Sequence, residues 1–389
     1  MVIKSNAFDV VIIGCGAAGL TAARTALARG RRVCIIDMAP TPARKVAASG
    51  GARCNFTNAD ANRNRYFGEN PDFVRGALAR FSPADVLNWA RGHGIKWVEK
   101  APGQYFCADG AGAILDALLR DAHGANMVMN TTVTRVSHTD GAFTIKTNRG
   151  EYFAKSVIVA SGGISFPDLI VSDIGYKIAR AFGHKIIPPR PGLCAIATDA
   201  FSPELAGISI PVQIRVGKSV IDDSMLFTHF GIGGPAVYRA TVRDAAGDIF
   251  IDMAPGIDIL SALQAAKKSD GRKTMASVLT AYLPARVARW IAGDDTRRIA
   301  DVRDADLRDI DGRIKRTIIP HSEYKYHGLR SAEVTRGGVS TDEISSKTME
   351  SKLQPGLFFA GEVLDIAGDL GGFNLQWAWA SGAVAGDAA

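Results

Sequence analysis

Two apolar runs near the start of the chain enclose a stretch that is rich in glycine and alanine. The first run covers residues 10–13, and the second covers residues 33–36 and ends on Asp37. Apolar runs of this length are typical of buried strands, and the stretch between them is long enough for a helix that extends to about Gly30. The pattern therefore predicts a strand, a helix and a second strand.

The periodicity of apolar positions predicts several further elements. Helices are expected over residues 83–91 and 113–122, whereas residues 38–70 lack helical periodicity. From residue 132 the period changes to two, which predicts a β-meander followed by a wholly apolar, buried strand over 156–160.

The turn after the first strand has the glycine spacing of a nucleotide-binding loop. Gly14 allows a tight turn, Gly16 lets the backbone approach a phosphate, and Gly19 lets the helix pack closely against the strand. The N-terminus of the following helix favours an anion. Asp37 lies where a carboxylate accepts hydrogen bonds from ribose hydroxyls. These residues predict a dinucleotide site.

A proline-rich segment, residues 188–191, indicates a domain boundary, because consecutive prolines cannot continue a helix or a central strand. The residues beyond it are first β-rich and then helical and charged, and glycine-rich α/β sequence returns near the C-terminus. We therefore predict a discontinuous α/β protein with three parts. The nucleotide-binding domain comprises residues 1–188 and 337–389, an inserted β-rich domain comprises 189–256 and 317–336, and a small helical domain comprises 257–316.

The composition is typical of a globular protein with a sizeable core, with 47% hydrophobic and 22% charged residues. The 5 cysteines are widely spaced and form no C-x-x-C pair, so we expect neither a disulfide framework nor a metal site. The net charge of +7 would suit nucleic acid, but the basic residues are scattered and no aromatic residues interleave with them. We therefore expect a small-molecule substrate and no nucleic-acid partner.

Residues 12–15 resemble the cleavage site of a lipoprotein signal, but the apolar run before Cys15 is shorter than the roughly 7 residues that such a signal needs. No uncharged apolar stretch approaches the roughly 18 residues of a membrane-spanning helix. We expect a cytoplasmic protein that does not associate with a membrane. The sequence indicates no particular oligomeric state.

Two further clusters combine glycines with polar residues. Residues 50–58 contain two glycines, Arg53 and several small polar side chains, which suits a loop around a charged, planar cofactor, although a surface turn has the same composition. Residues 361–374 combine a Gly-Glu pair at a strand end with Gly371 and Gly372 at the start of a helix. The dipole of that helix would favour the negative charge of a reduced flavin. The clusters therefore favour FAD as the dinucleotide.

Six segments, in this order, resemble the BaiN-like (YhiN-like) bacterial flavoproteins: residues 50–58, 160–167, 226–235, 337–339, 348–352 and 361–382. The resemblance covers nearly the whole chain. It implies an NAD(P)/FAD-dependent oxidoreductase whose FAD-binding Rossmann domain, of the two-dinucleotide type, is split by the inserted domains. The chain departs from the family pattern at Ala52, Gly233 and Phe373, and the missing hydroxyl at Phe373 argues against a proton-donor role there.

The resemblance also implies which residues contact FAD. The glycine turn would hold the pyrophosphate, Asp37 the adenosine ribose, and the C-terminal cluster the flavin ring. The full set of expected contacts is Gly14, Gly16, Ala17, Ala18, Gly19, Asp37, Met38, Gly51, Arg53, Cys54, Asn55, Thr57, Val133, Ala160, Ser161, Gly162, Gly361, Glu362, Asp365, Gly371, Gly372, Phe373, Asn374 and Leu375.

Two residues are candidates for chemistry. His229 is the candidate catalytic residue, because histidine titrates near neutrality and can act as a general acid. A hydrogen-bonded structural histidine in a glycine-rich turn is the alternative. Cys54 is a candidate redox thiol near the flavin, although packing alone also accounts for it.

We predict a reductase that passes hydride from NAD(P)H through FAD to a small unsaturated substrate. The glycine-rich segments 110–112 and 231–234 lack the frame of a strand before and a helix after that marks a dinucleotide fingerprint, so only one complete fingerprint is expected. NAD(P)H is therefore expected as a transient co-substrate. Two alternatives remain open: a flavin-dependent RNA-modifying protein and a non-catalytic flavin redox sensor.

Overall fold

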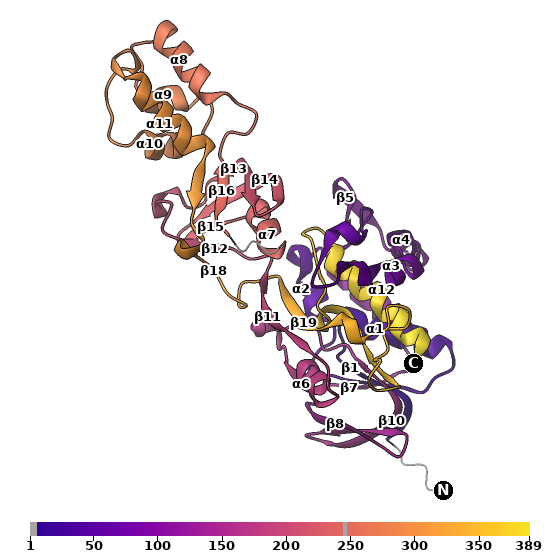
Figure 1. Cartoon of the computed structure of the whole chain (residues 1–389). Coiled ribbons are helices and arrows are strands. Elements are labelled where there is room, and N and C mark those ends of the chain that lie inside the picture. The colour runs from indigo at the N-terminus through magenta and orange to yellow at the C-terminus, as the bar shows by residue number, and fades with distance from the viewer. Residues whose placement is uncertain (1–5, 244–246) are drawn as a thin grey trace. The chain divides into compact units, whose positions relative to one another are not determined.

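The computed structural model describes residues 6–243 and 247–389. The chain divides into two compact units, Met1–Gly192 with Ala332–Ala389, and Leu193–Ser331. Both ends of the chain therefore belong to the first unit, which carries the indigo and the yellow ends of the colour scale in Figure 1.

A seven-stranded sheet lies at the centre of the first unit. Its strands are β1 Ala7–Ile13, β2 Val33–Ile36, β7 Asn126–Val128, β8 Val133–Thr139, β9 Ala142–Thr147, β10 Gly150–Val159 and β20 Leu357–Phe359. Strands β7, β2, β1 and β10 lie parallel in this order, and β20 runs parallel to the second half of β10. The first half of β10 continues into the antiparallel strands β9 and β8. This is a Rossmann-type sheet with a meander at one side.

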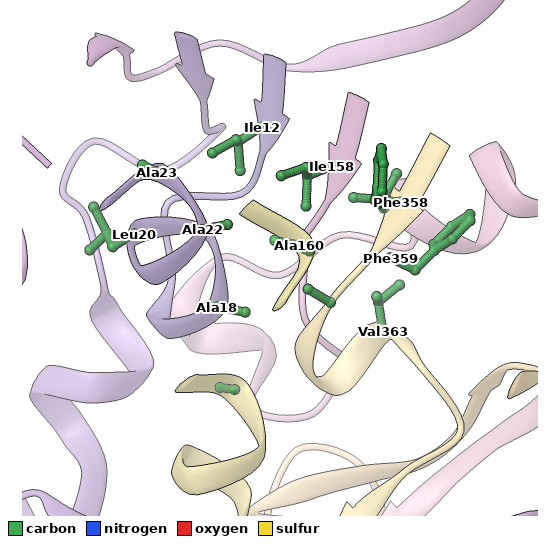
Figure 2. Packing of buried hydrophobic residues seen from close by; sticks show 14 of the residues in the cluster. Ile12, Ala18, Leu20, Ala22, Ala23, Ile158, Ala160, Phe358, Phe359 and Val363 are labelled. Atoms are coloured by element: carbon green, nitrogen blue, oxygen red, sulfur yellow. The ribbon is translucent and has the colours of Figure 1, made fainter. Parts of the chain in front are cut away.

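Two helices from opposite ends of the chain pack against each other beside this sheet: α1, Ala17–Ala28, and α12, Phe373–Ala388. A Cβ at Gly382 would lie 2.4 Å from the carbonyl oxygen of Ala18, and one at Gly386 would lie 2.1 Å from that of Ala22. Because both contacts advance by one helical turn in the same direction, the helices run parallel. Figure 2 shows Ala18 and Ala22 near apolar side chains of the strands, including Ile12.

Smaller sheets and further helices complete the first unit. The strands are β3 Asn55–Asn58, β5 Trp97–Ala101 and β6 Gln104–Cys107 in one antiparallel sheet, β4 Tyr66–Phe67 with β21 Ala367–Gly368, and β11 Ile186–Gly192 with β19 Val334–Val339. The helices are α2 Arg44–Ala52, α3 Val74–Arg80, α4 Pro83–Gly92, α5 Ala111–Asp121 and α6 Ile174–Ala181. Ser82 caps α4 in a capping box with Asp85, and the helix begins at Pro83 as the sequence predicts.

The second unit combines an antiparallel sheet with helices around one core. The strands, in spatial order, are β17 Thr317–Ile319, β16 Ile249–Asp252, β13 Ser209–Val216, β14 Ser219–Thr228, β15 Gly231–Gly233, β12 Ile196–Thr198 and β18 Tyr324–Tyr326. The helices are α7 Pro235–Val242, α8 Ile259–Ser269, α9 Met275–Leu279, α10 Ala285–Ala292 and α11 Asp304–Lys315. Leu263 and Ile310 of the helices belong to the same apolar cluster as Ile251 of the sheet.

Some local predictions are wrong. Helix α2 lies within residues 38–70, where no helix is expected, and its regularity is interrupted at Ser49, Gly50 and Gly51. The last strand of the predicted meander and the apolar strand over 156–160 are one continuous strand, β10. Strand β1 lies along one side of it, whereas on the other side its first half pairs with β9 and its second half with β20, so the period of the sequence changes within a single strand.

The prolines of residues 188–191 lie inside strand β11, directly before the division between the two units at Gly192. Strand β11 tolerates them because its sheet with β19 has only two strands and because the register shifts between Ile187 and Arg190. Helices begin at both glycine-rich segments: α5 begins at Ala111, close to the helix expected over 113–122, and α7 begins at Pro235, directly after 231–234. The preceding strands β6 and β15 belong to antiparallel sheets, so neither segment forms a parallel strand–helix–strand unit.

Among the helices of the described residues, none has both the length and the apolar character needed to cross a membrane.

Candidate functional site

Four strand ends form a row at the carboxyl edge of the parallel sheet. Ile13 is in register with Ile36 on one side and with Val159 on the other, and Val159 is in register with Phe359. The next residues along the four strands are Gly14, Asp37, Ala160 and Ala360. Open α/β sheets bind ligands at this edge, so the row marks the candidate site.

The glycine turn after β1 packs tightly against the protein at two positions. A Cβ at Gly14 would lie 2.3 Å from the carbonyl oxygen of Ala160, and one at Gly19 would lie 1.9 Å from the carbonyl oxygen of Gly14. Gly14 also has a φ of 112°, a conformation that residues with a Cβ rarely adopt. These two glycines let β1, β10 and α1 come together.

Gly16 differs, because a Cβ there would meet no protein atom within 4 Å. Gly16 is the N-cap of α1, and no side chain of the described residues caps this helix. The first intrahelical bond is donated by the Leu20 N–H to the Gly16 carbonyl, so the N–H groups of residues 17–19 have no intrahelical acceptor. Open space beside these N–H groups, at the positive end of the helix dipole, suits a pyrophosphate.

Asp37 is held beside this turn by two backbone hydrogen bonds. The Cys15 N–H donates to Oδ2 at 2.6 Å, and the Ala39 N–H donates to Oδ1 at 2.8 Å. Each carboxylate oxygen has a further lone pair, so the oriented side chain can also accept hydrogen bonds from ribose hydroxyls. Met38 is half-buried next to Asp37, and Val133 is buried at the start of β8.

The N-terminus of α12 is a second helix end that favours negative charge. Gly372 is its N-cap, with a φ of 93°, and within residues 6–243 and 247–389 no side chain caps the helix. Phe373 precedes Gly382 by nine residues, or about 14 Å along the axis. Because Gly382 lies opposite Ala18 in the parallel helix pair, the two N-termini are offset by about this length. They can therefore face two separate parts of one extended dinucleotide.

Strand β3 positions the start of α12. A Cβ at Gly372 would lie 2.6 Å from the carbonyl oxygen of Thr57, and the Gly372 N–H donates to the amide oxygen of Asn55 at 3.2 Å. The Thr57 hydroxyl is fully buried and donates to Oε1 of Gln376 at 2.5 Å. The buried side chain of Thr57 thus holds α12 in place through Gln376. Gln376 is not among the residues that the sequence predicts for the site.

The residues before β3 differ in exposure. Gly51 and Arg53 are exposed at the end of α2, whereas Cys54 is fully buried. Burial raises the pKa of the Cys54 thiol to about 12, so the thiol is protonated at neutral pH. A protonated, inaccessible thiol is a poor nucleophile, which favours the packing role of Cys54 over the redox role.

Glu362 is held by segments that are distant in the sequence. Its Oε2 lies 3.0 Å from Nζ of Lys45, and its Oε1 accepts the Thr335 N–H at 2.8 Å and the Ser165 hydroxyl at 3.3 Å. Lys45 also donates to Oγ of Ser165 at 3.1 Å, and Oγ1 of Thr335 accepts the N–H groups of Ile164 and Ser165. Lys45, Ser165 and Thr335 are absent from the sequence-based set, because nothing in their local sequence indicates that these segments meet.

The segments that follow β10 and β20 lie at the same edge. Ser161 and Gly162 are half-buried after the buried Ala160. Gly361 donates its N–H to Oγ of Ser381 at 2.9 Å and accepts the indole N–H of Trp377 at 3.1 Å. Helix α12 therefore fixes the backbone that presents Glu362.

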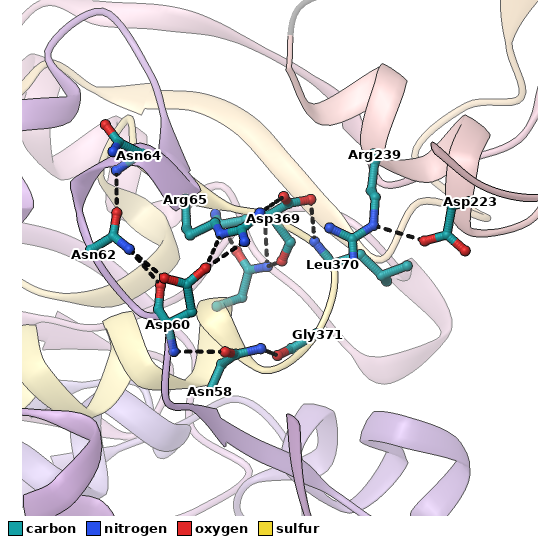
Figure 3. Close-up of polar contacts among 12 residues, drawn as sticks. Asn58, Asp60, Asn62, Asn64, Arg65, Asp223, Arg239, Asp369, Leu370 and Gly371 are labelled. Carbon is teal, nitrogen blue, oxygen red and sulfur yellow. Dashed lines mark hydrogen bonds and ion pairs between the residues drawn. The ribbon is translucent and has the colours of Figure 1, made fainter. Parts of the chain in front are cut away.

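Polar contacts order the loop that leads into α12 (Figure 3). Asn58 donates its side-chain N–H to the carbonyl of Gly371 at 2.7 Å, and the fully buried Asp369 lies 3.5 Å from Nη1 of Arg65. Asn374 accepts the Gly368 N–H at 2.7 Å through its side-chain oxygen. Gly371, Gly372 and Asn374 are thus placed by the first unit itself.

Asp365 and Phe373 are buried in the same region, and Leu375 is half-buried. Asp365 accepts the Glu69 N–H at 2.8 Å, and burial raises the pKa of its carboxyl group. The ring of Phe373 lies edge-on to Tyr66, whose hydroxyl donates to the Phe373 carbonyl at 3.1 Å. Burial also raises the pKa of Tyr66.

His229 belongs to the second unit, so it is not part of the cluster that the strand ends of the first unit assemble. It is exposed in the turn between β14 and β15, and the neighbouring Phe230 stacks on His327 with ring centroids 3.9 Å apart. The described part of the chain contains no group of three or more His, Cys, Asp or Glu side chains placed to hold a metal ion.

Comparisons with known proteins agree with this architecture. A family described as HI0933-like protein Rossmann domain matches residues 8–388. The chain is 36% identical over 388 residues to the ribosomal RNA dihydrouridine synthase of Escherichia coli K12, covering 96% of each chain. It is 28% identical over 403 residues to the 3-dehydro-bile acid delta(4,6)-reductase of Clostridium scindens, covering 97% of this chain and 98% of that protein.

A solved structure shows the same fold. The open conformation of a flavocytochrome c3 fumarate reductase matches with a TM-score of 0.50 at 16% identity, covering 99% of this chain and 78% of that one. The site residues also fit FAD: the open space at Gly16 suits the pyrophosphate, Asp37 the ribose, and the N-terminus of α12 the flavin edge that becomes negative on reduction. The resemblance seen in the sequence is thus confirmed, and the chain belongs to the HI0933-like family, the BaiN-like FAD-binding oxidoreductases with a Rossmann-type α/β fold.

Proposed function

We propose that this protein reduces uridine in ribosomal RNA to dihydrouridine, with FAD as its bound cofactor. The observation that carries the proposal is the 36% identity to a ribosomal RNA dihydrouridine synthase over 96% of both chains. A match of this extent includes the second unit as well as the FAD-binding unit. The bile-acid reductase is similar over a comparable length but at 28% identity.

The chemistry of uridine is consistent with a flavin site. The C5=C6 double bond is conjugated to the C4 carbonyl, so its reduction adds a hydride at C6 and a proton at C5 and leaves a single bond. Reduced FAD would supply the hydride, and we propose NAD(P)H as the source of its two electrons. Asp37, the N-termini of α1 and α12, and the Lys45–Glu362 pair would hold the cofactor and orient it.

This proposal replaces the expectation that nucleic acid is not a partner. The expectation of no nucleic-acid partner rests only on the scatter of basic residues along the sequence. The similarity to an enzyme that is named for its action on ribosomal RNA does not support that expectation. The net charge of +7 suits a polyanionic substrate. Arg44 and the exposed Arg53 bracket helix α2 in the FAD-binding unit.

The proposal is tested with ribosomal RNA that lacks the modification. Purified holoprotein is incubated with this RNA and NADH or NADPH, and the digested nucleosides are quantified by mass spectrometry. We expect dihydrouridine above the level given by the Gly16→Val protein, which should lack FAD. A flavin-replete wild-type protein that forms no dihydrouridine in any ribosomal RNA fraction would contradict the proposal.

A reductase of small unsaturated carbonyl compounds is the second candidate, supported by the 28% identity to the bile-acid reductase over 97% of this chain. Anaerobic mixing with NADH or NADPH first tests the electron donor through loss of the oxidised-flavin absorbance. Recovery of that absorbance on addition of RNA supports the first candidate, whereas recovery only with a small enone supports the second. Recovery with neither would favour the redox-sensor alternative.

A further inference from the structure

The loop of residues 165–170 begins inside the cluster of strand ends. Its first residue, Ser165, is fully buried and is bonded both to Nζ of Lys45 and to the carboxylate of Glu362. The backbone N–H groups of Ile164 and Ser165 also donate to Oγ1 of Thr335, each at 2.9 Å. The start of the loop is therefore fixed to the site that holds the cofactor.

The rest of the loop holds two large apolar residues in an unfavourable backbone conformation. Phe166 has a φ of 57° and a ψ of 62°, and Ile170 has a φ of 58° and a ψ of 82°. They flank a single 3-10 turn, Pro167–Leu169. Left-handed conformations are disfavoured for residues with a Cβ, and most strongly for β-branched ones such as isoleucine. Such strain persists mainly at functional positions.

The same two side chains are also exposed to solvent. Phe166 and Ile170 are each 38% exposed, although their neighbour Ser165 is fully buried. A glycine or an asparagine would suit both this backbone and this exposure better. The packing of the first unit therefore accounts for neither their conformation nor their apolar character, which points to a partner that covers them.

Positive charge borders this apolar surface. Arg44 and Lys45 are consecutive at the start of α2, and Nη2 of Arg44 lies 3.5 Å from the carbonyl oxygen of Asp168 in the 3-10 turn. The loop itself contributes the carboxylate of Asp168, so the positive charge lies on the α2 side. Lys45 is paired with Glu362, so Arg44 supplies the cation beside this surface. An apolar, partly aromatic surface next to a guanidinium group matches the base and the phosphate of a nucleotide.

We propose that Phe166 and Ile170 form the surface against which an unpaired base of the RNA substrate stacks, with Arg44 facing an adjacent phosphate. This inference rests on the proposed function and adds the element that recognises the substrate. Aromatic side chains bind unpaired bases by stacking without reading their sequence. An enzyme that modifies a base must first unstack it, and an apolar surface at the site offsets part of that cost.

The test uses a substitution that should not harm folding. Asparagine tolerates the left-handed conformation, so Phe166→Asn should fold at least as well as the wild type while lacking the ring. Leu353→Asn is the matched control, because Leu353 is an apolar residue of the same unit that is 48% exposed outside this loop. Phe166→Trp keeps an aromatic surface.

Each holoprotein is titrated with a labelled single-stranded ribosomal RNA fragment by fluorescence anisotropy, and flavin content and dihydrouridine formation are measured in parallel. Phe166→Asn should weaken RNA binding by about 5- to 150-fold, the range for loss of one stacked base, with unchanged flavin content and flavin reduction. Leu353→Asn should bind like the wild type, and Phe166→Trp should retain most of the affinity.

Two negative results have different meanings. If Phe166→Asn binds RNA and forms dihydrouridine as the wild type does, the stacking role is wrong and the proposed function stands. If the wild type neither binds the RNA nor forms dihydrouridine, the proposed function is wrong and the stacking role falls with it. If Phe166→Asn loses flavin or stability, a structural role is indicated, and normal RNA binding by Ile170→Asn would then overturn the inference.

Discussion

Replacement of Gly16 by valine should remove FAD without disturbing the fold. A Cβ at Gly16 would have no protein atom within 4 Å, and its φ of −91° and ψ of −167° belong to an extended conformation that any residue adopts. The valine side chain would fill the open space beside the first-turn N–H groups of α1. The pyrophosphate is expected in this space, so cofactor and side chain should compete for it.

The expected loss can be estimated from the hydrogen bonds that the phosphate would lose. Two charge-assisted bonds from backbone N–H groups, each contributing about 1.5–3 kcal/mol, give about 3–6 kcal/mol, or roughly a 10²- to 10⁴-fold increase in the Kd of FAD. The apoprotein should lose no more than about 1 kcal/mol of unfolding free energy, because only the N-cap preference of α1 changes.

Gly19→Ala is the control for a glycine that the protein itself requires. Its new Cβ would lie 1.9 Å from the carbonyl oxygen of Gly14, so the apoprotein should lose about 1–3 kcal/mol or more of unfolding free energy. FAD titration of each apoprotein and urea unfolding without cofactor measure the two effects separately. A Gly16→Val protein with wild-type FAD affinity would refute the placement of the pyrophosphate, and one as unstable as Gly19→Ala would show that Gly16 is needed for folding.

Three further predictions concern other parts of the first unit. Gly382→Leu should separate α12 from α1, because a Cβ at this position would lie 2.4 Å from the Ala18 carbonyl oxygen. The substitution should lower both the affinity for FAD and the urea concentration at the unfolding midpoint. Wild-type values for both would contradict the parallel packing of the two helices. Burial raises the pKa of the Cys54 thiol to about 12, so this thiol should resist iodoacetamide in the native protein, and the Cys54→Ser protein should still undergo flavin reduction. Rapid labelling of native Cys54, detected by mass spectrometry, would contradict this prediction. Burial lowers the pKa of His184, although Glu343 lies 3.3 Å from its Nδ1, so the folded state favours the neutral ring. Stability should therefore fall as the pH drops below about 6.5, where the unfolded state gains a proton first, and His184→Gln should flatten this slope in urea titrations; an unchanged slope would argue against the assignment.

The elements that the sequence predicts well are those whose signals are local. The β1–α1–β2 unit follows from two apolar runs and three glycines, and the close packing at Gly14 and Gly19 follows from their spacing. The N-terminus of α12 is likewise indicated by Gly371 and Gly372. Backbone freedom and helix ends depend on neighbouring residues, so a short stretch of sequence is enough to reveal them.

The contacts that the sequence does not reveal join distant segments. Lys45 and Glu362 are 317 positions apart, and the hydroxyl of Ser165 between them is one of many similar side chains. Their pairing depends on the register that places β10 and β20 side by side. The left-handed conformation of Phe166 is equally hidden, because a large apolar residue gives no local signal for it.

A single-turnover reaction tests the central claim most directly. The FAD-loaded protein is reduced anaerobically, freed of excess reductant and mixed with unmodified ribosomal RNA, while the flavin absorbance and the dihydrouridine content are followed together. The account predicts that the flavin becomes oxidised as dihydrouridine appears, with one dihydrouridine formed for each flavin oxidised. A flavin that remains reduced in the presence of this RNA, and RNA that contains no dihydrouridine, would contradict it.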